Sequence, residues 1–236
     1  MKIHAVKRIL DRVPQFDERS RSFRSVEGIE HLPFRNYTWP LKLWLDQGQE
    51  GACVGFGIAH ELAAIPVQVM YINDAYAFQI YEEAKKIDVW PGENYQGTSV
   101  LAGLKVAKNM GLIEEYRWAF GLEDFLRTCG RKGPVIFGLN WYTGMMNPDR
   151  NGFIHKTGIV EGGHCILGRG TSVKYFMTGD KYSMSNVDKK KGYAIFHNSW
   201  GRSWGYNGTC KISLEDLEAL LYEQGECAIP TIRNAA

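Results

Sequence analysis

The 236-residue chain lacks any stretch that approaches the ~18 consecutive apolar residues of a membrane-spanning helix. Its first ten residues also lack the apolar run of a secretory signal peptide. A formal net charge of only +2 leaves no concentrated basic field of the kind that a dedicated nucleic-acid binder uses. We therefore expect a soluble, cytoplasmic protein with no membrane and no nucleic acid among its partners.

The cysteines lack a recognisable pattern as well. Five are present, an odd number, at wide spacings and without a C-x-x-C pair: Cys53, Cys129, Cys165, Cys210 and Cys227. A disulfide framework is therefore not expected, and a reducing compartment suits the chain better. Ligand pairs at the short fixed spacing of a zinc site are absent too, so we expect no metal and no other cofactor.

The composition is that of an ordinary globular protein, with 44% hydrophobic and 23% charged residues. No internal repeat or low-complexity linker divides the chain. Basic residues gather before residue 25, as Lys2, Lys7, Arg8, Arg12, Arg19, Arg21 and Arg24. We interpret residues 1–12 as a basic, solvated N-terminal extension, with contact to an acidic partner as the alternative, and residues 13–236 as a single domain.

Hydrophobic periodicity changes along this domain. It predicts helices over 52–64, 74–86 and 99–110, within a helical lobe at about 46–128. It then predicts short strands over 134–139, 164–167, 173–177, 193–198 and 208–212, within a β-rich lobe at about 130–215, and a short helix after Ser213. Helices followed by strands indicate an α+β fold with two segregated lobes, and a cleft between them as the binding site.

The first informative stretch runs from Asp46 to Gly57, a glycine-rich loop that leads directly into an apolar helix. It places Cys53 in the first turn of that helix. There the unpaired N–H groups and the helix dipole favour a thiolate, which lowers the pKa of a thiol. On its own, however, a free cysteine is more often a buried packing residue.

The second stretch places His164 after two glycines, Gly162 and Gly163, at the mouth of a short apolar strand. Glycines at such a place let another backbone or a ligand come close. Because side chains alternate along a strand, His164 and Cys165 point to opposite faces, so at most one of them faces the cleft. A single histidine is otherwise an ordinary core or surface residue.

The third stretch places Asn198 beside Trp200 at the end of another strand, in a segment with two Trp-Gly pairs. An asparagine there can hold an imidazole in one tautomer while the indole excludes water from the hydrogen bond. Taken alone, the two Trp-Gly pairs could also form only a packed turn.

Together, these stretches closely resemble the papain-like cysteine peptidases, in which a Gln, a Cys on a helix, a distant His and an Asn-Ser-Trp-Gly run follow one another along the chain. The resemblance covers about residues 13–215. It implies the papain-like α+β fold, with a helical N-terminal lobe, an antiparallel sheet or barrel as the C-terminal lobe, and the active site in the cleft between them. It also implies thiol-dependent hydrolysis of peptide bonds through a thioester, with a peptide or protein as substrate.

By the same resemblance, Cys53 is the nucleophile, His164 the general base and Asn198 the residue that orients it. Gln47, six residues before Cys53, forms the oxyanion hole with the backbone N–H of the cysteine. Trp200 shields the histidine–asparagine pair. Gly97, Gly163 and Trp200 are the candidates for contact with the substrate.

The chain also departs from the family. Glu50 and Tyr95 occupy positions where secreted members carry the cysteines of a disulfide, and Val54 stands where a Trp usually follows the nucleophile. The segment before residue 13 is too short for a long inhibitory propeptide, so latency by a prodomain is not expected. The interval from His164 to Asn198 is long, and 171–191 is predicted to form an extended hairpin at the cleft edge. The chain in these respects resembles the shorter papain-like proteins of bacteria, archaea and phages, which makes a virion or an infected bacterial cell an alternative location.

Other interpretations stay open. Among the histidines, His60 lies two helical turns beyond Cys53, about 10 Å along the axis, and His197 should point to the other strand face, but His155 in a loop remains an alternative base. The protein could keep the fold as a catalytically silent binding or structural component, for example of a virion. It could also be a thiol amidase or transferase that acts on a non-protein amide.

Overall fold

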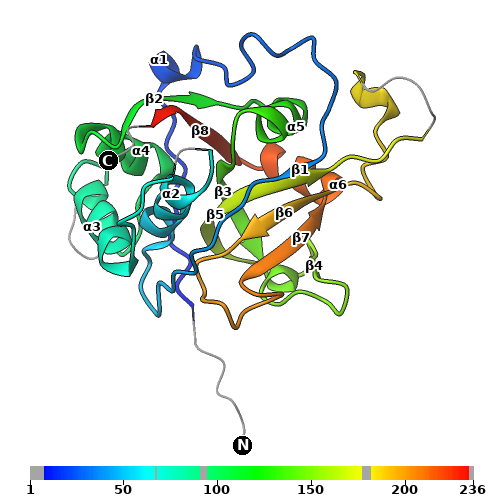
Figure 1. The fold of residues 1–236 in the computed structure, drawn as a ribbon. Helices are drawn as coiled ribbons and strands as arrows, with labels where there is room; N and C mark the ends of the chain where they lie inside the picture. The colour runs from blue at the N-terminus through cyan, green and yellow to red at the C-terminus, as the bar shows by residue number, and fades with distance from the viewer. Residues whose placement is uncertain (1–7, 67, 91–94, 177–181, 234–236) are drawn as a thin grey trace, which may run out of the picture.

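The structure is a computed structural model that describes residues 8–66, 68–90, 95–176 and 182–233. The helices α2, α3 and α4 gather on one side of the molecule, and most of the strands lie on the other side together with α5 and α6 (Figure 1). In chain order the elements are α1 (Glu18–Arg21), β1 (Tyr37–Thr38), α2 (Cys53–Ala63), α3 (Asp74–Lys85), α4 (Val100–Asn109), β2 (Ile113–Trp118), α5 (Leu122–Arg131), β3 (Val135–Tyr142), β4 (Phe153–Ile154), β5 (Val160–Ser172), β6 (Tyr193–His197), β7 (Thr209–Ser213), α6 (Leu214–Tyr222) and β8 (Glu226–Arg233), with short 3-10 turns at Thr143–Met145 and Met184–Asn186.

Local sequence signals set where the helices begin. The side chain of Asn73 accepts a hydrogen bond from a backbone N–H in the first turn of α3, and Ser99 and Ser213 do the same for α4 and α6. Such caps satisfy N–H groups that a helix leaves unpaired. None of the helices in the described parts of the chain combines the length and the apolar character that spanning a bilayer requires.

The central helix α2 is enclosed, and every one of its residues is buried. Two glycines allow this close packing. A Cβ on Gly55 would lie 2.2 Å from the carbonyl oxygen of Ala77 in α3, and a Cβ on Gly57 would lie 2.6 Å from the sulfur of Cys165 in β5. The helix that begins at Cys53 is therefore held against the sheet as well as against its helical neighbours.

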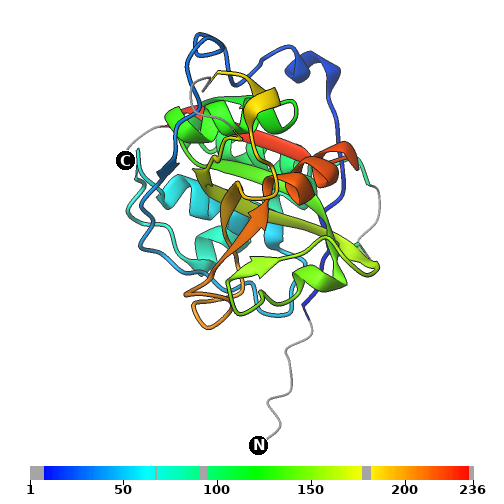
Figure 2. The same cartoon turned by 90° about the vertical axis from the view of Figure 1, so that its right-hand side faces the viewer.

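The strands form one sheet in the order β2-β8-β3-β5-β6-β7-β4, with β1 paired to β5. The long strand β5 lies between β3 and β6 and pairs with both in antiparallel fashion, with Leu139 opposite His164 and Leu167 opposite His197. When the molecule is turned by 90°, this sheet faces the viewer and α2 and α3 lie behind it (Figure 2). The antiparallel register returns the chain after β6, at Asn198, toward His164.

Two hydrophobic cores correspond to the two lobes. One is built around α2, α3 and α4 and includes Phe56 and Leu62. The other fills the space around β3, β5 and β6 and includes Phe137, Trp141 and Phe196. The predicted α+β, two-lobed organisation is thus what the chain adopts, and the junction between the cores is where the candidate site lies.

The predicted elements agree with the structure to different degrees. The three predicted helices match α2, α3 and α4 to within a residue at each end, and four of the five predicted strands fall on β3, β5, β6 and β7. The strand predicted over 173–177 is wrong where it is described: β5 ends at Ser172, and beyond it Tyr175 and Val187 form an isolated bridge rather than a strand pair. Met177 lies outside the described residues. Elements that the sequence patterns did not predict include α5, β2 and β8. The strands β2 and β8 pair with each other across more than 100 residues, and no local pattern reveals that.

The hairpin predicted over 171–191 is present in its described part, but it is not at the cleft edge. The bridge between Tyr175 and Val187 extends the β5–β6 pair beyond Ser172. His164 lies near the other end of β5, and the seven residues from it to Thr171 span roughly 23 Å of strand. The extension therefore projects away from the site (Figure 1).

Two buried histidines join the lobes behind the site. The rings of His60 in α2 and His197 in β6 lie 4.6 Å apart between centroids. The Nε2 atom of His60 accepts the backbone N–H of Leu45 at 3.2 Å, which a protonated ring could not do. Burial lowers the pKa of His60 well below its ordinary value and that of His197 to about 3.

These histidines predict acid sensitivity. In the unfolded chain they take up protons as the pH falls through about 6.5, whereas in the folded protein they stay neutral, so stability falls as the pH drops below that value. Below that value each such histidine costs about 1.4 kcal/mol per pH unit, so at pH 5.5 the two together lower the free energy of unfolding by about 3 kcal/mol, a substantial part of the ~5–15 kcal/mol of a typical domain. Urea unfolding followed by circular dichroism should therefore give a much lower free energy of unfolding at pH 5.5 than at pH 7.5.

The matched control is the exposed His31. A His197→Leu variant should have a shallower dependence of unfolding free energy on pH than the parent, and His31→Gln should keep the parental dependence. Equal slopes in all three proteins would show that the buried imidazoles do not control acid stability.

Candidate active site

Cys53 is the first residue of α2, and its side chain is fully buried. The backbone N–H of Cys165 lies near the Cys53 sulfur and favours the thiolate, so a thiol of the helical lobe lies against β5 of the sheet lobe. Since His164 precedes Cys165 in β5, the same junction holds the histidine. The sulfur of Cys165 itself faces Gly57 in α2.

His164 is fixed by Asn198. Its Nε2 atom lies 2.8 Å from Asn198 Oδ1, which also accepts the backbone N–H of Ser199 at 2.8 Å. An atom that accepts a backbone N–H is the amide oxygen, so Nε2 of His164 must carry a proton, and in the neutral ring Nδ1 keeps its lone pair. Nδ1 has no hydrogen-bond partner within the described residues. The imidazole is therefore oriented at one nitrogen and available as a base at the other.

Aromatic rings surround this pair. The ring of His164 lies 4.7 Å from that of Trp141 in β3 and 5.0 Å from that of Trp200, measured between centroids. His164, Asn198 and both indoles are at most 2% exposed. Water is therefore kept from the histidine–asparagine hydrogen bond, which strengthens it.

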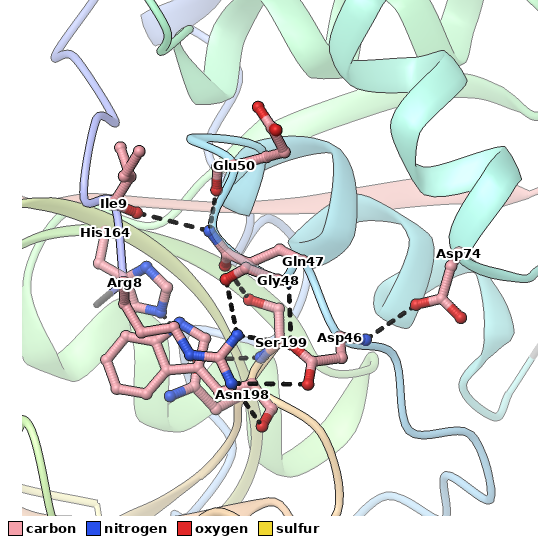
Figure 3. A network of polar contacts seen from close by, with 11 residues as sticks. Arg8, Ile9, Asp46, Gln47, Gly48, Glu50, Asp74, His164, Asn198 and Ser199 are labelled. Carbon is pink, nitrogen blue, oxygen red and sulfur yellow. Dashed lines mark hydrogen bonds and ion pairs between the residues drawn. The ribbon is translucent and has the colours of Figure 1, made fainter. Parts of the chain in front are cut away.

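Gln47 is hydrogen-bonded to Ser199, the residue that follows Asn198. Its Oε1 accepts the hydroxyl of Ser199 at 2.6 Å, and its backbone N–H donates to the carbonyl of Ser199 at 2.9 Å (Figure 3). Its Nε2 donates to the carbonyl of Glu50 at 2.7 Å and lies 3.5 Å from the carbonyl oxygen of Ile9. The amide is thus held with its N–H groups on the side where the chain near the N-terminus passes.

That stretch of chain, residues 8–13, runs between the two lobes (Figure 1), and we call it the groove segment. On the sheet side, the N–H of Gly163 donates to the carbonyl of Leu10 at 3.2 Å, and the carbonyl of Gly163 accepts the N–H of Arg12 at 2.9 Å. A Cβ on Gly163 would lie 2.0 Å from the carbonyl oxygen of Arg12. The residue before His164 must therefore be glycine for a backbone to pass this closely.

The helical side of the groove makes matching contacts. The carbonyl of Thr98 accepts the N–H of Val13 at 3.1 Å, and the hydroxyl of Tyr95 donates to the carbonyl of Asp11 at 2.9 Å. A Cβ on Gly97 would lie 1.6 Å from that same carbonyl oxygen. Gly97 and the glycine before His164 thus face each other across one extended strand of chain.

Arg8 lies over the outer end of the groove. Its Nη1 donates to Asp46 Oδ1 at 2.6 Å and to the carbonyl of Gly48 at 2.7 Å, and its Nη2 donates to the carbonyl of Trp200 at 3.2 Å (Figure 3). Its guanidinium also lies 5.8 Å from the centre of the Trp200 ring. The described part of the expected N-terminal extension is therefore packed against the site rather than solvated.

Burial sets the protonation of the pair in this closed arrangement. It raises the pKa of the Cys53 thiol to about 11 and lowers the pKa of His164 to about 4, and the hydrogen bond that His164 donates to Asn198 opposes the second effect. Near neutral pH both groups are thus uncharged. The lowered thiol pKa expected at a helix N-terminus is not present here, because removal of water outweighs the helix dipole.

The sequence-predicted residues Cys53, His164, Asn198, Gln47 and Trp200 all come to this junction. Trp141 and the hydroxyl of Ser199 were not predicted. Trp141 lies in β3, far from the other site residues in the sequence, and no local pattern marks it. Ser199 directly follows Asn198 in the Asn-Ser-Trp-Gly run, so its position in the sequence could have identified it.

The alternative base His155 is not brought to Cys53. It follows β4, three strands away from β5 or roughly 14 Å, and its Nε2 lies 3.0 Å from Asp149 Oδ2. All five cysteines are free and buried. In the described parts of the chain, no three His, Cys, Asp or Glu side chains come together as metal ligands would.

No family model matches the sequence, and no curated protein matches it. Solved structures do match. The crystal structure of xylellain, a cysteine protease from Xylella fastidiosa, is 16% identical, covers 96% of each chain and superposes with a TM-score of 0.64. The recombinant stem bromelain precursor is 14% identical over 96% of this chain and 77% of that one, with a TM-score of 0.52. With the two lobes and the sheet described above, these likenesses establish the papain-like α+β fold for this chain.

Proposed function

We propose that the protein is a cysteine peptidase that hydrolyses peptide bonds through a thioester. One observation carries this proposal: His164 is fixed through Nε2 by Asn198, keeps Nδ1 unpartnered among the described residues, and adjoins the residue whose N–H contacts the Cys53 sulfur. A nucleophile, a base and a residue that orients the base are the parts that acyl transfer requires. The folds of a cysteine protease and of a bromelain precursor support the same reading.

In the proposed reaction, His164 takes the proton of the Cys53 thiol at Nδ1 as the sulfur attacks the carbonyl carbon of the substrate. The resulting imidazolium is stabilised by its hydrogen bond to Asn198 and donates its proton to the leaving amine. Water then hydrolyses the thioester with the same imidazole as base. Gln47 Nε2 and the N–H of Cys53 stabilise the oxyanion. None of these steps calls for a metal or another cofactor.

Gln47→Ala is expected to lower kcat by roughly 10²–10³-fold, the usual effect of removing one oxyanion donor. KM should change little, because the lost hydrogen bond forms mainly in the transition state. Steady-state kinetics on a fluorogenic peptide would measure both.

The control must separate the loss of the Gln47 N–H donor from the loss of the hydrogen bond that positions the side chain, because Gln47 Oε1 also accepts the Ser199 hydroxyl. Ser199→Ala removes that contact and leaves the amide N–H groups in place. A loss in Ser199→Ala as large as that in Gln47→Ala would contradict the oxyanion role.

The proposal as a whole is tested by labelling with a peptidyl epoxide under reducing conditions, followed by mass spectrometry. Modification should fall on Cys53 and not on the four other buried thiols. Absence of label on the thiol, in protein that hydrolyses no peptide, would favour a silent structural protein instead. Labelling without peptide hydrolysis, together with turnover of a cell-wall cross-link, would favour a thiol amidase.

We also propose a cytoplasmic location, because the five free cysteines suit a reducing compartment, and the absence of membrane and nucleic-acid partners, as the balanced charge suggests. Residues 13–236 would act as one catalytic domain. A small papain-like peptidase of bacterial or phage origin remains our proposal for the kind of peptidase. Cell fractionation of the tagged protein tests the first point directly.

A further inference from the structure

The groove segment carries one side chain that is completely enclosed. The side chains of Arg12 and Glu226 are both 0% exposed and form an ion pair. Arg12 Nη2 and Nε donate to Glu226 Oε2 at 2.5 and 3.0 Å, and Nη2 also donates to the carbonyl of Gln224 at 3.0 Å. A guanidinium held this way occupies a pocket with a charged floor.

The walls of this pocket are shaped for that group. A Cβ on Gly138 would lie 2.4 Å from Arg12 Nε and 2.9 Å from its Nη2, so any larger residue in β3 would fill the space. The same Cβ would lie 2.9 Å from the side chain of Val100 at the start of α4. The pocket thus lies between the sheet and the helical lobe, with apolar walls and a single carboxylate at its end.

The sheet register connects the pocket to the nucleophile. Cys165, Gly138 and Glu226 lie side by side on adjacent strands β5, β3 and β8, and such neighbours share one face of a sheet. Cys165 contacts the Cys53 sulfur, and Glu226 is two strands away, roughly 10 Å. That distance suits an arginine on an extended chain that passes Gly163 in front of Cys53.

The buried carboxylate of Glu226 requires a cationic partner to remain charged. Burial raises the pKa of Glu226, and the charge of Arg12 acts against that rise. When another chain replaces the groove segment, Glu226 loses its partner unless the newcomer supplies one, and an unpaired buried charge is strongly unfavourable. The occupant of the groove should therefore bring its own guanidinium.

We propose that the pocket now filled by Arg12 is the specificity pocket of the peptidase, and that it selects peptide substrates by an arginine side chain bound to Glu226. This inference depends on the proposed peptidase function. Arginine is favoured over lysine, since two donors reach Glu226 and one of them also reaches a backbone carbonyl, a geometry that a single ammonium does not reproduce.

The pocket is tested first without catalysis. In full-length Arg12→Ala, ethylguanidine replaces the deleted atoms, and ethylurea is its neutral counterpart. Ethylguanidine at ten times its Kd should raise Tm by about 3–6 °C. No rise is expected with ethylurea, in the parent protein, or in the double variant Arg12→Ala/Glu226→Gln. Equal effects of the two compounds would overturn the selection of a guanidinium.

The substrate role is tested with fluorogenic peptides that carry arginine or its neutral analogue citrulline at each position in turn. The readout is the kcat/KM ratio of each arginine peptide to its citrulline partner, so that general changes in access to the groove cancel. At one position the parent should prefer arginine by roughly 10–100-fold, the range of a charge-assisted hydrogen bond. Glu226→Gln should bring that ratio close to one and leave the other positions unchanged.

The outcomes are distinguishable. Peptide hydrolysis with no arginine preference at any position, or with a preference that survives Glu226→Gln, overturns the inference and leaves the peptidase proposal intact. Hydrolysis of no peptide by any variant overturns the peptidase function and the substrate role with it, while the ethylguanidine shift still reports whether the pocket selects a guanidinium.

Discussion

Cys53→Ala is expected to abolish peptide hydrolysis, with a loss of roughly 10⁶-fold in kcat, as for removal of the nucleophile in other acyl-transfer enzymes. The alanine keeps the Cβ and removes only the sulfur, which Cys165 contacts through its backbone N–H. Because α2 is held by Gly55 and Gly57 rather than by this thiol, the fold should remain. Burst and steady-state kinetics on a fluorogenic peptide, with circular dichroism as the check on folding, measure the effect.

Another buried thiol provides the control. Cys210 in β7 is 2% exposed and free, so Cys210→Ala removes the same atom from a comparable environment outside the junction. It should keep peptidase activity within about threefold, although its stability falls because a small cavity is created. Equal activity of the parent and Cys53→Ala would exclude the proposed mechanism.

The sequence revealed the fold to the extent that short-range patterns determine it. Ser99 and Ser213 stand before apolar periodic segments, and both cap helices there. The catalytic candidates were found because their order and spacing resemble a known family. By contrast, β8 was not predicted. It pairs with β2 and β3, which are distant from it in the sequence, and it contains a proline at residue 230, which is unusual in a strand.

The position of Arg12 illustrates why the rest could not be predicted. In the sequence it is one of seven basic residues before residue 25, and a solvated arm was the natural interpretation. Its partner Glu226 lies 214 positions later and pairs with it only when the lobes close on the groove segment. Periodicity and composition contain no information on such a pair. The close approach of a backbone to Gly163 was easier to predict, because a glycine directly before a candidate site residue already suggested it.

His164→Ala is the second change with a near-complete effect, and it tests the proton transfer separately from the nucleophile. It should lower kcat by roughly 10⁴–10⁶-fold, because the Cys53 thiol then has no base. Its reaction with iodoacetamide should also change. In the parent, the imidazole can take the thiol proton as the sulfur attacks the reagent, so alkylation is expected to proceed near neutral pH.

In His164→Ala the thiol must ionise alone, and burial raises its pKa toward about 11. Alkylation of Cys53, followed by mass spectrometry from pH 6 to 10, should therefore become appreciable only in the alkaline part of the range. His155→Ala is the matched control, since that histidine is half exposed and paired with Asp149; it should keep both the activity and the parental alkylation profile. An unchanged profile in His164→Ala would mean that another group takes the proton, and the assignment of His164 as the base would then be wrong even if Cys53 proved essential.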